Sequence, residues 1–186
     1  MDLAVLQFFQ EHVKPGFLTD FMNFYTHLGE AGILWIALTL ALMIHPKTRK
    51  AALAAALSLI VMAVLNNIVL KSLIARPRPY TTYPELVILI KKLSSFSFPS
   101  GHTSSAFAVV TAVSLHHRRA SWVLFPAAIL MGVSRIYFSV HYCTDVLGGA
   151  VAGVLYAVVG LFAAHLIWKR WGGPLTAIGS KKPRER

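Results

Sequence analysis

The sequence predicts an all-α integral membrane protein, a polytopic bundle of transmembrane helices. Of its 186 residues, 56% are hydrophobic and only 13% are charged, a composition outside the range of ordinary soluble domains. The apolar residues stand in long runs, and about 20 of them suffice to cross a bilayer as a helix. Basic residues stand between the runs, as they do in membrane proteins whose orientation is set by charged loops.

The expected elements follow in order from the N-terminus. Residues 1–14 mix apolar and polar side chains and are too short to span, which indicates an interfacial helix. The mixed segment 17–30 leads at the interface into the first span, which the basic turn 45–50 ends. The segment 71–102 is mixed, so it must lie above the membrane or against protein. We expect five spans, with the N-terminal segment as an interfacial or a sixth helix: 31–44, 51–70, 101–116, 121–133 and 146–168.

Neither an internal repeat nor a domain boundary is visible in the sequence. Residues 1–170 are therefore expected to form a single membrane domain, and residues 171–186 a basic cytoplasmic tail. Asp2 and Glu11 occupy the N-terminal segment, which has no basic region followed by a cleavage site. A removable signal peptide is not expected.

The net charge of +11 indicates membrane orientation and not nucleic acid binding. The basic residues do not form a patch interleaved with aromatic residues on a soluble face, so a nucleic acid partner is not expected. With five spans, one side receives eleven of the eighteen basic residues, and the positive-inside rule makes that side cytoplasmic. The candidate reactive residues fall on the extracytoplasmic side of the cell membrane. The eleven basic residues on the cytoplasmic side are Lys47, Arg49, Lys50, Arg118, Arg119, Lys169, Arg170, Lys181, Lys182, Arg184 and Arg186.

A turn at Pro99-Ser100-Gly101 opens an apolar helix and places His102 in its first turn. The unpaired N–H groups and the positive dipole end of such a helix start favour a phosphate-like anion. A helix cap with a nearby histidine is the simpler alternative. The sequence predicts an anion site with an acid–base group beside it.

Three basic residues on the same side supply positive charge for this site. Lys71, Arg78 and Arg135 stand at span ends or in loops, and a guanidinium group matches phosphate oxygens bidentately. Each alone could be a side chain that reaches the interface from a helix end. Together with the helix start they predict a cradle for an oxyanion.

His141 and Asp145 are four residues apart, so in a helix they share one face. The carboxylate would then hold one ring nitrogen and leave the other nitrogen to attack an electrophile. His102 would donate a proton to the leaving alcohol. A pair of residues at a helix start is the structural alternative.

Metal chemistry is not expected. Cys143 is the single cysteine, which excludes an internal disulfide and a thiolate zinc site. It lies between His141 and Asp145 but off their shared face, where packing is the expected role. Because the acidic residues do not cluster, the predicted reaction needs neither a metal nor a cofactor.

The motif Lys71-x6-Arg78-Pro79 is followed by Pro99-Ser100-Gly101-His102 and then by Ser134-Arg135-x5-His141-x3-Asp145. In residue type, spacing and order this arrangement resembles the three-part signature of the type 2 phosphatidic acid phosphatases, the membrane relatives of vanadium haloperoxidases. Members of that family typically have six membrane helices.

The resemblance implies a metal-independent phosphatase that forms a phosphohistidine. In it His141 attacks phosphorus, Asp145 orients His141, and His102 protonates the leaving group. Water activated by the histidine pair then hydrolyses the intermediate. The phosphoryl oxygens are bound by Lys71, Arg78, Ser100, Gly101 and Arg135.

The implied substrate is a lipid phosphate or diphosphate in the bilayer. The small size and outward site resemble bacterial members that act on undecaprenyl diphosphate, the carrier lipid of cell-wall synthesis. Phosphatidylglycerol phosphate, phosphatidic acid and diacylglycerol pyrophosphate are alternatives. A lipid or anion transporter without hydrolysis is an alternative of another class, and a peroxidase would need vanadate. The pair Gly149 and Gly153 permits close helix packing within the chain or in a homodimer.

Overall fold

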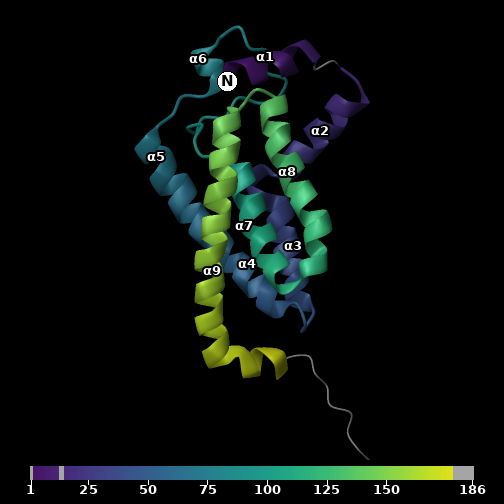
Figure 1. The fold of residues 1–186 in the computed structure, drawn as a ribbon, viewed down its shortest axis with the longest axis vertical. Helices are drawn as coiled ribbons and strands as arrows, with labels where there is room; N and C mark the ends of the chain where they lie inside the picture. The colour runs from purple at the N-terminus through teal and green to yellow at the C-terminus, as the bar shows by residue number, and fades with distance from the viewer. Residues whose placement is uncertain (1, 13–14, 178–186) are drawn as a thin grey trace, which may run out of the picture.

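The computed structural model describes residues 2–12 and 15–177, and this part of the chain is helical without a β-strand. Figure 1 shows long helices side by side, with the short helices 2–12 and 79–82 at one end. The elements are α1 (Asp2–His12), α2 (Phe17–Leu28), η1 (Glu30–Gly32), α3 (Ile33–Ile44), α4 (Arg49–Met62), η2 (Ala63–Leu70), α5 (Lys71–Ile74), α6 (Pro79–Thr82), α7 (Gly101–His116), η3 (Arg118–Ala120), α8 (Ser121–Tyr137) and α9 (Cys143–Ala177).

Helix α7 forms the centre of the bundle and contacts α3, α4, α8 and α9. Most of its residues are buried, and many are alanine or serine. Small side chains let neighbouring helices approach closely. On α9, a Cβ at Gly149 would lie 2.8 Å from the Ser100 carbonyl oxygen, and one at Gly153 would lie 2.6 Å from the Ser104 carbonyl oxygen. These glycines therefore serve the contact between α9 and α7 within the chain.

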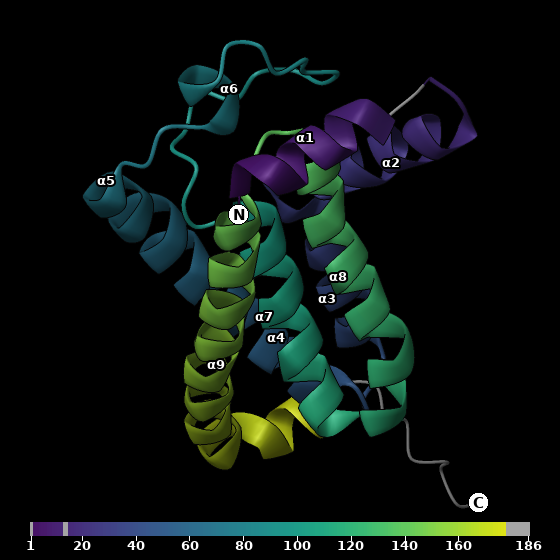
Figure 2. The ribbon, with the colours of Figure 1, turned by 45° about the horizontal axis from the view of Figure 1, so that its top comes forward.

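Helix α4 continues through the π-helical segment η2 into α5 without a break in helical dihedral angles. A π-helix inserts extra residues per turn and is found at functional sites. Within η2 the buried Asn66 accepts a hydrogen bond from Ser104 Oγ at 2.8 Å. Figures 1 and 2 show that the α5 end leans away from the bundle.

Three of the described helices are long and apolar enough to cross a membrane, at 49–82, 118–137 and 143–171. Helices α2 and η1–α3, bent by 55°, add a fourth if they form one span. Helix α7, predicted as a span, has 16 residues and at about 1.5 Å per residue is shorter than the roughly 30 Å hydrocarbon core. The all-helical membrane architecture is thus present, while the count of five or six spans stays a prediction.

The predicted helix ends differ from the observed ends by a few residues. Helix α8 continues past the predicted end at residue 133 to Tyr137, since Arg135 is buried by neighbouring helices and not placed in water. Helix α9 begins at Cys143 and extends to Ala177, into the range predicted as tail. Residues 178–186 of that tail lie outside the described part of the chain.

Helix α1 lies across one end of the bundle, beside the loop that follows α6 (Figures 1 and 2). Leu6 of α1 is buried in a cluster with Leu86, Ile136 and Tyr142. The Gln10 amide also bonds the backbone of this loop and the Ser139 hydroxyl. The N-terminal segment is therefore a helix that covers the end where the functional motifs meet.

Candidate active site

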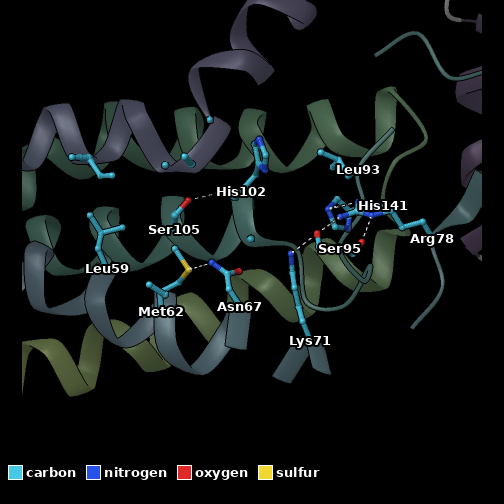
Figure 3. A pocket seen from close by; sticks show the side chains of 16 residues that line it. Leu59, Met62, Asn67, Lys71, Arg78, Leu93, Ser95, His102, Ser105 and His141 are labelled. Atoms are coloured by element: carbon cyan, nitrogen blue, oxygen red, sulfur yellow. Dashed lines mark hydrogen bonds between the residues drawn. The ribbon is translucent and has the colours of Figure 1, made fainter. Parts of the chain in front are cut away.

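A cavity of about 400 Å³ lies between α2–η1–α3 on one side and α4–η2–α5 on the other. Figure 3 shows Lys71, Arg78 and His141 near one end of it, and Leu59 and Met62 toward the other. The cavity is therefore polar at one end and apolar at the other. Its lining residues are Gly29, Ala31, Gly32, Ile36, Leu59, Met62, Ala63, Asn67, Lys71, Arg78, Leu93, Ser95, Gly101, His102, Ser105 and His141.

The structure divides the eight predicted site residues into two groups. Five of them line the cavity, namely Lys71, Arg78, Gly101, His102 and His141. The other three, Ser100, Arg135 and Asp145, are not in its lining and are almost fully buried.

His141 and Asp145 form a buried pair whose geometry defines the ring tautomer. His141 Nδ1 lies 3.4 Å from Asp145 Oδ2, and Arg78 Nη1 lies 3.3 Å from His141 Nε2. Because arginine can only donate, Nε2 is the accepting nitrogen and Nδ1 bears the proton. The ring thus presents a lone pair at Nε2 on the side that faces the cavity residue Arg78.

Burial lowers the pKa of His141 to about 3. The hydrogen bond with Asp145 acts in the opposite direction, and the positive charges of Arg78 and Arg135 add to the lowering. His141 is therefore neutral at physiological pH, the state in which an imidazole nitrogen is nucleophilic.

The Asp145 carboxylate is saturated with hydrogen bonds. Its Oδ2 accepts from the Ser97 hydroxyl and, at 3.0 Å, from the Tyr142 backbone N–H. Its Oδ1 accepts from Arg76 Nη1 at 2.6 Å. A buried carboxylate remains charged only when it has such partners, so this environment keeps an anion behind the imidazole.

Arg78 anchors the loop that precedes the helix start, in addition to facing His141. Its Nε donates to the Ser95 carbonyl at 2.6 Å, its Nη2 to the Ser95 hydroxyl at 3.0 Å, and its Nη1 to the Val140 carbonyl at 2.8 Å. The side chain is 4% exposed. The guanidinium group is fixed at the polar end of the cavity by these acceptors.

Lys71 lies beside the start of α7, next to Gly101. A Cβ at Gly101 would lie 3.8 Å from Lys71 Nζ and 3.3 Å from Asn67 Oδ1. Lys71 Nζ itself donates to Ser95 Oγ at 3.3 Å. The lysine ammonium group and the N–H groups of the helix start therefore adjoin one another, as an anion site requires.

His102 and Arg135 each have one buried nitrogen that bonds none of the described residues, namely His102 Nε2 and Arg135 Nε. His102 packs beneath Gly29, where an added Cβ would lie 2.6 Å from its Cδ2 atom. Arg135 Nη1 donates to the Thr26 hydroxyl. Buried polar atoms without partners are uncommon in proteins. Among the described residues, Trp35, Thr111 and Ser114 also have one, but only the atoms of His102 and Arg135 belong to residues predicted as acid and oxyanion ligand.

Sequence reasoning did not identify several residues that complete this site. Ser95 and Ser97 stand in a serine-rich stretch directly before the helix start. Such a stretch predicts a turn or loop whose hydroxyl groups can donate hydrogen bonds. Arg76 lies in the segment 71–102, in which the signature assigns roles to Lys71 and Arg78 but none to Arg76. Thr26 had no sequence signal, because its contact with Arg135 arises only from helix packing.

Among the described residues, His, Cys, Asp and Glu side chains do not gather in any group of three or more that could hold a metal ion. The expectation of a reaction without a cofactor stays a prediction.

Comparison with known proteins places this site in a family. The family model described as the PAP2 superfamily matches residues 47–171. The bacitracin transport permease protein BcrC of Bacillus licheniformis is 32% identical over 76% of this chain, and the match spans 66% of that relative, about two thirds of its length. The undecaprenyl-diphosphatase BcrC of Bacillus subtilis is 31% identical over 74% of this chain and 70% of its own.

A solved structure has the same fold. The transmembrane PAP2-type phosphatidylglycerolphosphate phosphatase of Bacillus subtilis superposes with a TM-score of 0.69, at 28% identity, over 91% of this chain and 85% of that one. These matches confirm the resemblance to type 2 phosphatidic acid phosphatases. The chain therefore belongs to the PAP2 superfamily, among its membrane-embedded lipid phosphatases.

Proposed function

We propose that this protein removes the terminal phosphate of a polyprenyl diphosphate, most simply undecaprenyl diphosphate, through a phosphohistidine at His141. The observation that supports this most directly is the pairing of an accepting Nε2 at the polar end of an amphiphilic cavity with a buried carboxylate at Nδ1. A polar end suits a phosphate group and an apolar end suits a lipid chain.

In the first step the lone pair of His141 Nε2 forms a bond to the terminal phosphorus, and the bond from phosphorus to the bridging oxygen breaks. His102 must be protonated at both ring nitrogens for this step, a state that the negative charge of the bound phosphate favours, and it gives one of these protons to the departing oxygen. Asp145 accepts a hydrogen bond from the Nδ1–H group of His141 and stabilises the positive charge that develops on the ring. The lipid leaves with one phosphate fewer.

In the second step a water molecule attacks the phosphohistidine. His102, now without its proton, accepts a proton from the water as the oxygen–phosphorus bond forms. The bond to Nε2 breaks, which regenerates neutral His141 and releases inorganic phosphate.

The phosphoryl oxygens are negatively charged throughout the reaction, and the polar end of the cavity provides positive charges and hydrogen-bond donors for them. Lys71 and Arg78 line that end, and the backbone N–H groups near Ser100 and Gly101 form the start of α7. Arg135, whose Nε bonds none of the described residues, supplies a third positive charge. Donors fixed before the reaction stabilise a phosphoryl transition state without reorganisation.

The choice of lipid rests on the relatives and on position in the membrane. One relative is named an undecaprenyl-diphosphatase, and one solved structure is named a phosphatidylglycerolphosphate phosphatase, so phosphatidylglycerol phosphate and phosphatidic acid are the alternatives. The distribution of basic residues supports an extracytoplasmic site in the cytoplasmic membrane. All eight proposed site residues come from one chain, so the proposed reaction does not call for a homodimer.

A transporter is the second candidate, because one relative is named a bacitracin transport permease protein. A binding site for an anionic lipid needs cations and a helix start. It does not need a neutral histidine held by a buried aspartate. The dyad of His141 and Asp145 therefore favours hydrolysis.

The test is phosphate release by purified protein in detergent, with excess chelator present. The four substrates are undecaprenyl diphosphate, phosphatidylglycerol phosphate, phosphatidic acid and a soluble phosphate ester. We expect preference for the diphosphate and a loss of roughly 10³-fold or more in His141→Ala, with full activity in His165→Ala, a control on the exposed surface of α9.

Each alternative has its own outcome in this assay. Retained turnover in the His141→Ala variant would exclude His141 as the nucleophile. Loss of activity on chelation with recovery on adding magnesium would exclude the cofactor-free reaction. No release from any substrate by folded wild-type protein would favour the transporter.

A further inference from the structure

A chain of charged side chains connects the proposed catalytic dyad to the first helix of the protein. Arg76 Nη1 donates to Asp145 Oδ1 at 2.6 Å, and Arg76 Nη2 donates to Asp2 Oδ2 at 3.1 Å. Asp2 belongs to α1, Arg76 follows α5, and Asp145 lies in the first turn of α9. Three segments far apart in sequence thus share one guanidinium group.

Arg76 is held in place by more than these two carboxylates. Its guanidinium carbon lies 4.0 Å from the centre of the Tyr142 ring. Its backbone carbonyl accepts from the Ser97 N–H at 2.9 Å. Tyr142 and Ser97 are the same two residues that donate to Asp145 Oδ2. Apart from His141 and Arg76 itself, the carboxylate has two direct partners among the described residues, Ser97 and Tyr142, and each of them also contacts Arg76.

Asp2 fixes the arginine from the opposite side and joins it to α9. Its carboxylate accepts from the Thr144 backbone N–H at 3.1 Å and from the Thr144 hydroxyl at 2.6 Å. Partial burial alone would raise the pKa of Asp2, but the hydrogen bonds from Thr144 and Arg76 outweigh it and lower that pKa. Asp2 is therefore an anion that satisfies an N–H group at the start of α9, as a helix cap does.

The position of Arg76 relative to the imidazole gives this network a consequence for catalysis. Arg78 faces the reactive nitrogen of His141, whereas Arg76 binds the carboxylate behind the other nitrogen. Arg76 holds Oδ1, and Oδ2 is the oxygen that lies 3.4 Å from His141 Nδ1. Without Arg76 a fully buried carboxylate would have an oxygen without a partner and would turn toward another donor.

We propose that Arg76 is a positioning residue, which acts through Asp145 to aim His141 at phosphorus, and that α1 supports it through Asp2. This inference rests on the phosphohistidine reaction proposed above. It gives Asp2 a supporting role behind the dyad, in addition to the cover that the N-terminal helix provides. Arg76 does not line the cavity, so its effect is expected on turnover and not on phosphate binding.

The experiment compares Arg76→Ala, Arg76→Gln, Arg76→Lys and Asp2→Asn with wild type, using the lipid that the wild type hydrolyses best. Gln10→Ala is the matched control, because Gln10 is a second attachment of α1 that does not contact Arg76 or Asp145. The measured quantities are kcat, KM, the inhibition constant of inorganic phosphate, and Tm in detergent.

We expect Arg76→Ala and Arg76→Gln to lower kcat by roughly 10- to 100-fold, the range seen when partners behind a reactive ligand are removed. KM and the phosphate inhibition constant should stay within about threefold. Arg76→Lys should recover part of the lost kcat, because a lysine retains the charge but not the fork that serves two carboxylates. Asp2→Asn should show a smaller loss of kcat, and Gln10→Ala should retain wild-type kcat.

Two results would overturn the inference while the proposed function stands. One is an active wild type with unchanged kcat in both Arg76→Ala and Arg76→Gln. The other is an equal loss of kcat in Gln10→Ala, which would mean that any loosening of α1 has the same effect. Failure of the wild type to hydrolyse any lipid would instead remove the proposed function. If Arg76→Ala does not fold, Arg76→Gln and Asp2→Asn decide the question by the same measurements.

Discussion

At the scale of single residues, the site is built around opposite demands on one imidazole. In the proposed reaction His141 must be neutral to attack, yet it becomes positive once it bears phosphate. Burial and the neighbouring arginines favour the neutral ring, and the carboxylate of Asp145 stabilises the charged one. Both influences are present before substrate arrives, so little reorganisation is needed during the reaction.

The lowered pKa of His141 predicts how activity depends on pH. An ordinary histidine, with a pKa near 6.5, is mostly protonated at pH 5, whereas His141, with a pKa of about 3, stays mostly neutral there. Because the pKa is lowered, loss of the nucleophile by protonation moves to more acidic pH. We expect that kcat/KM shows no acidic limb from His141 between pH 7 and 5.

The measurement is kcat/KM from pH 4 to 9 in detergent. The phosphate group of a substrate titrates near pH 6 itself, so its own pKa is determined by phosphorus NMR in the same detergent and its contribution is divided out. An acidic limb with an apparent pKa of 6 to 7 that survives this correction would contradict a neutral His141.

Motif residues could be predicted from the sequence because ionisable groups are rare at the ends of apolar spans and therefore stand out. Lys71, His102 and His141 were identified in this way, and the structure places all three around one cavity. Ser97 and Thr26 could not be identified, since hydroxyl groups are common in membrane helices and loops. Their contacts depend on which segments of the chain pack against one another in the fold. The spacing of residues within one segment does not contain this information.

At the scale of elements, the number of spans was harder to predict than their helical character. Helix α7 is enclosed by other helices, so it need not be long or uniformly apolar. Its serine residues bond within the protein, as Ser104 does with Asn66. Hydropathy measures the preference for lipid, and a helix that faces mostly protein is therefore poorly described by it.

The glycines of α9 lead to a prediction about stability. A Cβ at Gly153 would lie 2.6 Å from the Ser104 carbonyl oxygen and 2.8 Å from the Phe107 Cβ, and neither atom is at the end of a flexible side chain. Gly153→Ala must therefore push α9 away from α7. We expect a loss of about 1–3 kcal/mol, the usual cost of overfilling a packed interior, measured as a lower Tm in detergent.

The control for this prediction is Val151→Leu on the same helix, where the side chain is 64% exposed on the bundle surface. It adds one carbon on the face directed toward lipid and should leave Tm unchanged. An unchanged Tm in Gly153→Ala would show that α9 and α7 are separated more widely than the structure indicates. A dissociated oligomer in that variant would show that the glycine face joins two copies instead.

At the scale of the whole molecule, all the functional motifs lie at one end. Helices α1 and α6 lie at this end, and the turn between α3 and α4 lies at the other (Figures 1 and 2). The basic turn that contains His45 would be cytoplasmic by the positive-inside rule. The proposed orientation therefore assigns opposite sides of the membrane to α6 and to His45.

Cysteine labelling in cells tests this orientation directly. Thr81 on α6 and His45 in the α3–α4 turn are both exposed, and neither is one of the proposed site residues. Each is replaced by cysteine in a chain that also has Cys143→Ser, so that a single thiol is present. A maleimide that does not cross membranes should label Thr81→Cys in intact cells, and His45→Cys only after permeabilisation. The reverse pattern would place the site on the cytoplasmic side and contradict the proposed orientation.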